Sequence, residues 1–153
     1  MAKDKNKNIL NNVIMRYKSA AKTPLQKVQE YFKSKCVEYE KVGEDDAFKV
    51  EYLEDNTGKM KLIKSEAENV CKEAILEYNK KINERKSDIT KYESNGYMTS
   101  KRNAEVDIAN YEMEKEYVNT QYLQPLDNPD ADIYVAYKRG FENGLMKNAI
   151  LKK

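Results

Sequence analysis

The segment from Ser65 to Asn95 contains neither glycine nor proline, and this constrains the fold more than any other feature of the chain. Ser65 and Glu68 form the capping-box pattern that would open a helix there. The positions of one helix face recur at alternating steps of four and three. This seam consists of Cys71, Ile75, Tyr78, Ile82, Arg85, Ile89 and Tyr92. Because tyrosine and arginine are too polar for a dry coiled coil, we expect one long helix that packs against several shorter helices or protrudes towards a partner.

The residues around Thr23 predict where another helix begins. Thr23 is a preferred N-cap residue, Pro24 suits the first helical position, and Gln26 completes a capping box. Apolar side chains follow at steps of three and four as far as Val42, and Gly43 is a typical C-terminal stop. We therefore expect this helix to end at Gly43.

The residues before Thr23 separate into a polar lead and an amphipathic segment. Residues 1–8 are rich in lysine and asparagine, and we expect them to be a disordered basic lead. Residues 8–20 place apolar side chains three and four apart, which predicts a short amphipathic helix. These apolar side chains are Ile9, Leu10, Val13, Ile14 and Tyr17.

Two more helices are predicted in the C-terminal part of the chain. Thr99 or Ser100 would cap the first of them, which should end at Pro125. Asp130 or Asp132 would cap the second, which runs towards the C-terminus with aromatic residues along one side.

The hydrophobic period changes between residues 48 and 63. Phe48, Val50 and Tyr52 occupy every second position. The same alternation resumes after a turn that ends at Gly58. This pattern predicts a β-hairpin over residues 48–63. A lone hairpin is barely stable in water, so it would have to lie on helices or on another subunit.

Together these patterns predict a mainly α fold, an elongated bundle of about five helices with one β-hairpin insertion. A chain of 153 residues is one ordinary domain in length, so we expect residues 1–153 to form a single helical domain, with residues 130–153 as a C-terminal helix or tail. The composition is 40% hydrophobic and 35% charged. The apolar residues should therefore lie in narrow stripes along the helices.

The absence of histidine excludes much of the usual catalytic chemistry. Histidine is the side chain that most readily moves protons near neutral pH and the commonest nitrogen ligand for metals. Cys36 and Cys71 fall on apolar stripes, where a free thiol behaves as a small hydrophobic group. The acidic stretch from Asp127 to Asp132 suggests a calcium loop, but Pro129 interrupts the pattern. We therefore expect that the protein is not an enzyme and that it has neither a cofactor nor a metal site.

Charge is segregated along the chain although the net charge is only +2. Residues 1–41, 79–103 and 137–153 carry a basic excess, whereas residues 42–78 and 104–136 carry an acidic excess. Such alternation lets one part of a molecule attract another part of it, or of a neighbouring copy. With so small a net charge, nucleic acid is a secondary expectation as partner.

The segment after Pro129 carries the residues that we expect to bind a partner. They are Tyr134, Tyr137, Lys138, Arg139, Gly140, Phe141, Gly144 and Leu145. Tyrosine suits this role because it offers a large, rigid contact area with a polar end. Gly140 and Gly144 lie four residues apart, so they either pack closely against a neighbouring helix or belong to a flexible tail.

The predicted architecture is a short helical domain with a long helix, a hairpin and a basic C-terminal extension. This architecture resembles the head-to-tail adaptor or connector proteins that form rings beneath the portal of tailed bacteriophages. The resemblance is one of architecture rather than of motifs. It covers residues 66–94, residues 48–63 and the segment after Pro129. It implies portal and tail subunits as partners.

We expect a non-catalytic structural or assembly protein that contacts copies of itself or a larger protein. The alternative is a small regulator or inhibitor, encoded by a phage or plasmid, that binds a protein or nucleic-acid surface of the host. The chain starts with polar residues and has no run of 18 apolar residues, so we expect neither a signal peptide nor a membrane span. The expected location is the cytoplasm, or a virion assembled there.

Overall fold

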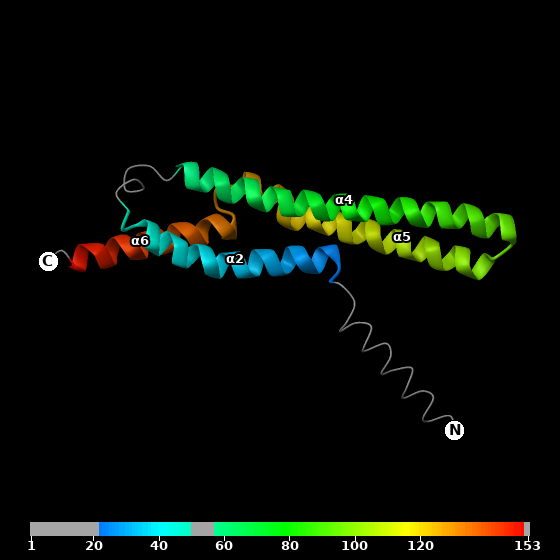
Figure 1. Cartoon of the computed structure of the whole chain (residues 1–153), viewed down its shortest axis with the longest axis horizontal. Helices are drawn as coiled ribbons and strands as arrows, with labels where there is room; N and C mark the ends of the chain where they lie inside the picture. Colours follow the sequence, from blue (N-terminus) through cyan, green and yellow to red (C-terminus); the bar gives the residue numbers. More distant parts are fainter. Residues whose placement is uncertain (1–21, 50–56, 152–153) are drawn as a thin grey trace, which may run out of the picture.

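The computed structural model describes residues 22–49 and 57–151, and within them four α-helices form an elongated helical bundle (Figure 1). These helices are α2 (Pro24–Asp46), α4 (Thr57–Asn95), α5 (Met98–Val118) and α6 (Asp132–Leu151). A π-helical turn, η1 (Asn119–Leu123), and a 3₁₀ turn, η2 (Gln124–Asp127), follow α5. The expectation of about five helices is therefore too high for the described part of the chain.

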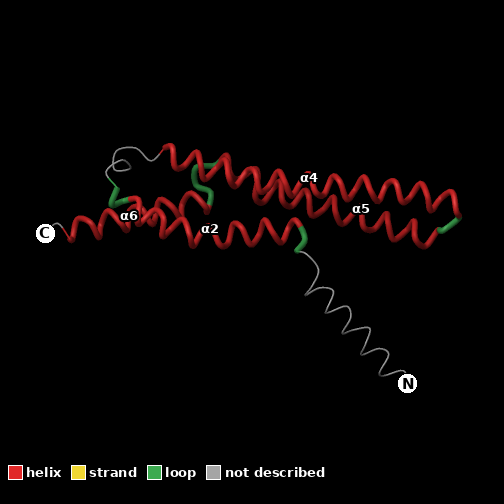
Figure 2. Tube along the Cα trace, in the orientation of Figure 1, coloured by secondary structure: helices red, strands yellow, loops and turns green. Residues whose placement is uncertain are grey.

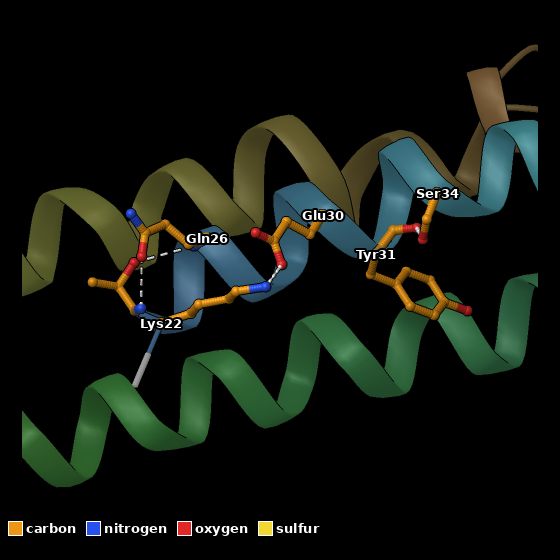
Figure 3. A network of polar contacts seen from close by, with 6 residues as sticks. Lys22, Gln26, Glu30, Tyr31 and Ser34 are labelled. Atoms are coloured by element: carbon orange, nitrogen blue, oxygen red, sulfur yellow. Dashed lines mark hydrogen bonds and ion pairs between the residues drawn. The ribbon is translucent and has the colours of Figure 1, made fainter. Parts of the chain in front are cut away.

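The start of α2 confirms the predicted capping box. The Thr23 hydroxyl accepts a hydrogen bond from the Gln26 backbone N–H at 3.1 Å, and the Gln26 side chain accepts one from the Thr23 backbone N–H at 3.0 Å. Figure 3 shows this turn, with Lys22 reaching along the helix to pair with Glu30. The predicted stop at Gly43 is wrong, because α2 continues through that residue to Asp46.

The predicted β-hairpin over residues 48–63 is wrong. Residues 57–63 belong to α4, and the described residues contain no strand (Figure 2). Apolar and polar residues alternate over only four residues, 59–62. The helical period is longer: Ile63 and Ala67, four residues apart, are both buried. The predicted cap Ser65 consequently lies inside the helix, exposed to solvent.

The long helix ends at the predicted place. Gly96 adopts a positive φ of 73°, a conformation that glycine reaches without the steric penalty of a side chain. Tyr97 then occupies the N-cap position of α5, so the predicted caps Thr99 and Ser100 lie one or more residues inside that helix. With so short a connection, α4 and α5 fold back on each other as an antiparallel pair (Figure 1).

The helix α2 runs antiparallel to the first part of α4. The hydroxyl of Tyr39 donates a hydrogen bond to Glu66 at 3.1 Å, and the backbone N–H of Leu25 donates one to the hydroxyl of Tyr78 at 2.9 Å. These two contacts set the register of α2 against α4. The core around them includes Val28, Ile63, Ala67, Cys71, Ala74, Val118, Leu126 and Ile133.

Some sequence predictions lie outside the described residues. They are the disordered lead over residues 1–8, the amphipathic helix over residues 8–20, and the part of the hairpin over residues 50–56. Among the helices of the described residues, none combines the length and apolar character that crossing a bilayer requires.

Candidate protein-binding surface

The contact between α2 and α6 depends on glycine. The two helices run parallel, so that Gly140 lies against the backbone of Glu40, and Gly144 lies against the backbone of Glu44. A Cβ atom on either glycine would overlap a backbone oxygen of α2. Gly43 makes the reciprocal contact, against the backbone of Tyr137. Of the two readings of the glycine pair, close packing is therefore confirmed.

The aromatic residues predicted to bind a partner lie inside the fold. Tyr134, Tyr137 and Phe141 are buried, with Tyr137 fully so. Tyr137 donates a hydrogen bond to the buried carboxylate of Asp46 at 2.8 Å, while Tyr134 donates one to the backbone oxygen of Leu126 at 2.6 Å. These side chains join α6 to the rest of the chain.

Three of the eight predicted residues face solvent on α6. They are Lys138, Arg139 and Leu145. The ammonium group of Lys138 donates a hydrogen bond to the backbone oxygen of Pro129 at 3.2 Å. The structure thus divides the predicted set into a buried group and an exposed, mostly basic group. Partner binding by the exposed group stays a prediction.

The two cysteines are free and poorly suited to nucleophilic chemistry. Burial raises the pKa of the Cys71 thiol to about 12, with a smaller contribution from the negative charge of Glu68. Burial also raises the pKa of Cys36, followed by the negative charge of Asp132. Because the thiolate is the nucleophile, both residues are held in the less reactive form at neutral pH.

A cavity of about 510 Å³ lies where α2 meets the turns that follow α5 and the start of α6. Its lining includes Phe32, Cys36, Tyr122 and Asp132. The residues suspected of a calcium loop serve the turn beside it, since Asn128 accepts a hydrogen bond from the backbone N–H of Asp130 at 2.9 Å. In residues 22–49 and 57–151, no three His, Cys, Asp or Glu side chains gather as metal ligands would.

The part of the α4–α5 pair that extends past the start of α2 is called the arm here, residues 81–110 (Figure 1). Arg85 joins its two helices, since its guanidinium lies 2.9 Å from Asp107 and 3.3 Å from Asp88. Nearer the tip, Lys101 lies 2.9 Å from Glu93. The arginine that interrupts the predicted apolar seam thus pairs with the neighbouring helix.

One side of α5 exposes apolar side chains to solvent. Val106 is 53% exposed, Met113 is 71% exposed and Tyr117 is 46% exposed. These residues follow one another at steps of seven and four, so they share one face of the helix. Val106 follows Ala104 by two residues, and Met113 follows Tyr111 by two residues. Ala104 and Tyr111 face α4, and two residues correspond to a rotation of roughly 200° about the helix axis, so Val106 and Met113 lie on the side away from α4. We call this set the outer face of α5.

Acidic residues run beside the outer face. Glu105, Glu112 and Glu116 are exposed and repeat with the same steps of seven and four, each one residue before a member of the outer face. This acidic ridge is therefore parallel to the apolar stripe. A binding partner that covers the stripe would meet three carboxylates along one edge.

Val106 and Met113 are not among the residues predicted from the sequence to bind a partner. The same step of seven that identifies a buried stripe was present on the other side of the helix, so a search for a second stripe would have found it.

Comparisons of the chain with protein-family models, with curated proteins and with solved structures find no match. The function must therefore be inferred from the geometry of the chain itself.

Proposed function

We propose that this chain is a non-catalytic assembly protein that binds a helix of a partner protein on the outer face of α5. The single observation that carries the proposal is the exposed apolar stripe of Val106, Met113 and Tyr117 on the side of α5 away from α4. An amphipathic helix can lay its apolar side on such a stripe.

The spacing of the stripe separates it from ordinary surface exposure. Apolar residues scattered singly over a surface need no partner, whereas residues aligned on one helix face offer a continuous contact. Methionine and tyrosine are enriched in the centres of interfaces. The tip of the arm adds Tyr97 and Met98, which are also exposed.

The acidic ridge favours one class of partner. A helix that carries lysine or arginine beside its apolar side would place these cations opposite Glu105, Glu112 and Glu116. Charge complementarity of this kind speeds encounter and selects orientation more than it adds affinity. We therefore propose a basic amphipathic helix as the element that binds.

The class of partner proposed here is compatible with the resemblance to connector proteins. Of the three features behind that resemblance, the long helix and the helical C-terminal segment are present, whereas residues 57–63 of the expected hairpin are helical. Self-assembly and binding to a portal or tail subunit stay proposals on this basis. The exposed Lys138 and Arg139 offer a second, basic contact surface on α6.

The test compares matched variants of the full chain. Val106→Glu with Met113→Glu places charge on the outer face, and Val37→Glu with Leu76→Glu places it on residues that are 73% and 67% exposed elsewhere. The chain is used to capture proteins from its native source, and each captured protein is titrated against the purified variants. The outer-face variant should bind roughly tenfold more weakly or worse, and the control should bind like the wild type.

Equal binding by both variants would contradict the proposal. Light scattering on the same samples separates an assembly subunit, which forms larger species alone or with its partner, from the alternative of a small inhibitor that stays monomeric or dimeric.

A further inference from the structure

We propose that the outer face of α5 binds helix α6 of a second copy of this chain. The inference rests on the proposed function, because it names the partner of the same surface. Three observations carry it: the spacing of the exposed residues on α6, their charge, and a hollow beside them.

The exposed side of α6 repeats the spacing of the outer face in reverse. Val135, Arg139 and Met146 follow one another at steps of four and seven, whereas the outer face has steps of seven and four. Val135 and Arg139 each stand two residues, or roughly 200°, from the buried Tyr137. Arg139 is exposed, Met146 is 63% exposed and Val135 is half-buried. These three residues therefore share the side of α6 that faces away from α2.

Two helices that lie antiparallel bring the steps into register. Arg139 of one copy is placed level with Met113 of the other. Because the step of four is the same on both helices, Val135 then falls level with Tyr117. Because the step of seven is the same, Met146 falls level with the first residue of the outer face. Each of the three residues on α6 therefore meets one residue of the outer face.

The charges agree with this register. Arg139 stands at the level of Glu112 and Glu116, two members of the acidic ridge. A guanidinium group between two carboxylates is favourable because its donors can serve both. Glu142, which follows Arg139 by three residues on α6, falls level with the uncharged Asn110. The register thus pairs opposite charges and avoids a repulsive contact.

A hollow beside the exposed side of α6 offers room for Tyr117. The hollow has a volume of about 310 Å³, lies between α2 and α6, and has Val135 and Arg139 in its lining. Tyr117 is 46% exposed, and in the antiparallel register its ring falls over this hollow. Glu40 and Asp132 also line the hollow, so a carboxylate is present to accept a hydrogen bond from the tyrosine hydroxyl. A tyrosine seated in a pocket is a typical anchor of an interface.

The contact forms between copies rather than within one chain. Helix α6 extends away from the arm along the long axis of the molecule (Figure 1). Gly140 and Gly144 hold it against α2 by backbone contact, so α6 does not swing round to the outer face of its own α5. Each copy carries both surfaces at different places, and the contact can therefore continue from one copy to the next.

Complementation between two variants of the full chain tests the inference. The outer-face variant, Val106→Glu with Met113→Glu, keeps α6 intact, and the α6 variant, Arg139→Glu with Met146→Glu, keeps the outer face intact. The wild type should associate in analytical ultracentrifugation at concentrations on the order of 100 µM, because a contact of two helices is at the small end of specific interfaces. Each variant alone should associate roughly tenfold more weakly or not at all, and an equimolar mixture should recover a complex with one copy of each.

Leu76→Glu is the matched control. Leu76 is 67% exposed on α4 and, unlike Val37, does not line the hollow, so this variant should associate like the wild type. A charge reversal tests the register. Arg139→Glu should weaken association roughly tenfold, and Glu112→Lys with Glu116→Lys in the other copy should restore it. Every substituted side chain is exposed, so circular dichroism should show the same helical content in all variants.

Three results would each overturn the inference: a wild type that stays monomeric, a mixture that forms no complex, or an outer-face variant that associates like the wild type. The proposed function is judged separately, by titration of captured proteins against the outer-face variant. A mixture without complex, together with weaker binding of a captured protein, would overturn the inference and keep the proposed function. A mixture without complex and unchanged binding of every captured protein would overturn both.

Discussion

Where α6 meets α2, the backbones of two helices touch at glycine residues, whereas along the arm α4 and α5 are joined by ion pairs between partly exposed side chains. The first contact surrounds the buried hydrogen bond between Tyr137 and Asp46. The second has Arg85, Ile89 and Tyr92 only half-buried along the seam.

The difference follows from how many helices cover α4. Beside α2, the α4 residues Ile63, Cys71 and Tyr78 are buried almost completely. Past the start of α2, only α5 faces the seam among the described residues, so polar side chains take over its edges. The part of α4 beside α2 is therefore deeply buried and supplies stability, whereas the arm leaves more of its side chains exposed to solvent.

The largest effect should come from Gly140→Ala. The added Cβ would overlap the backbone oxygen of Glu40, which neither helix can relieve without moving away. We expect the free energy of unfolding in urea to fall by about 3 kcal/mol. Gly58→Ala is the control, because nothing lies within 4 Å of the added atom and alanine favours the helix, so stability should hold or rise. Similar losses in both variants would mean that close approach is not what joins α2 and α6.

A pair of isoleucine substitutions compares the covered part of α4 with the arm directly. Ile63 is buried and Ile89 is half-buried on the same helix. Ile63→Ala should cost about 3 kcal/mol and Ile89→Ala about 1 kcal/mol in the same urea titration. Equal costs would show that the arm is packed as tightly as the covered part.

The burial of Cys71 predicts a loss of stability at alkaline pH. Its pKa is raised from 9.0 to about 12, so the folded state keeps the protonated thiol while the unfolded state ionises. The contribution is complete below pH 9 and is lost as pH rises from 9 towards 12. At pH 9.5 the loss from this thiol should be about 1 kcal/mol relative to pH 7. Cys71→Ala should give a flatter curve between pH 8 and 9.5, and an unchanged slope would speak against a buried thiol.

The smallest effect is expected for Arg85→Gln. Its partners are about one third exposed, so removal of both ion pairs should lower the free energy of unfolding by about 0.5 kcal/mol, and by less in high salt. Hydrogen exchange should show the change in residues 81–110 alone. Lys72→Gln breaks a single exposed pair with Glu68 and serves as control. A loss that is insensitive to salt would indicate packing rather than charge as the role of Arg85.

The sequence was sufficient for the elements whose local chemistry is unambiguous. The capping box at Thr23 and the end of the long helix at Gly96 were both predicted from residue type and spacing. The hairpin failed because the alternation of Met60 and Leu62 is too short to establish a strand. Only the longer period, in which Ile63 and Ala67 are buried, decides for a helix. Gly43 failed because glycine serves both as a helix stop and as a point of close contact, and the choice depends on α6, far away in the sequence.

The candidate surface was harder to predict for a related reason. A stripe of tyrosines on α6 looks the same in a sequence whether it is covered by the chain's own α2 or by another protein. The structure covers Tyr134 and Tyr137 from within. The outer face of α5 was hard to recognise because its members stand seven and four residues apart, with Glu112 and Glu116 between them in the sequence, although they share one helix face.

The glycine contact also has a consequence for the order in which the chain folds. Lys101 and Glu93 are only eight residues apart in the sequence, so the α4–α5 pair closes a short loop, whereas Gly140 must find Glu40 across a hundred residues. Closing so long a loop costs more entropy and comes later. The helical pair should therefore serve as the nucleus on which α2 and α6 meet in the final, rate-limiting step.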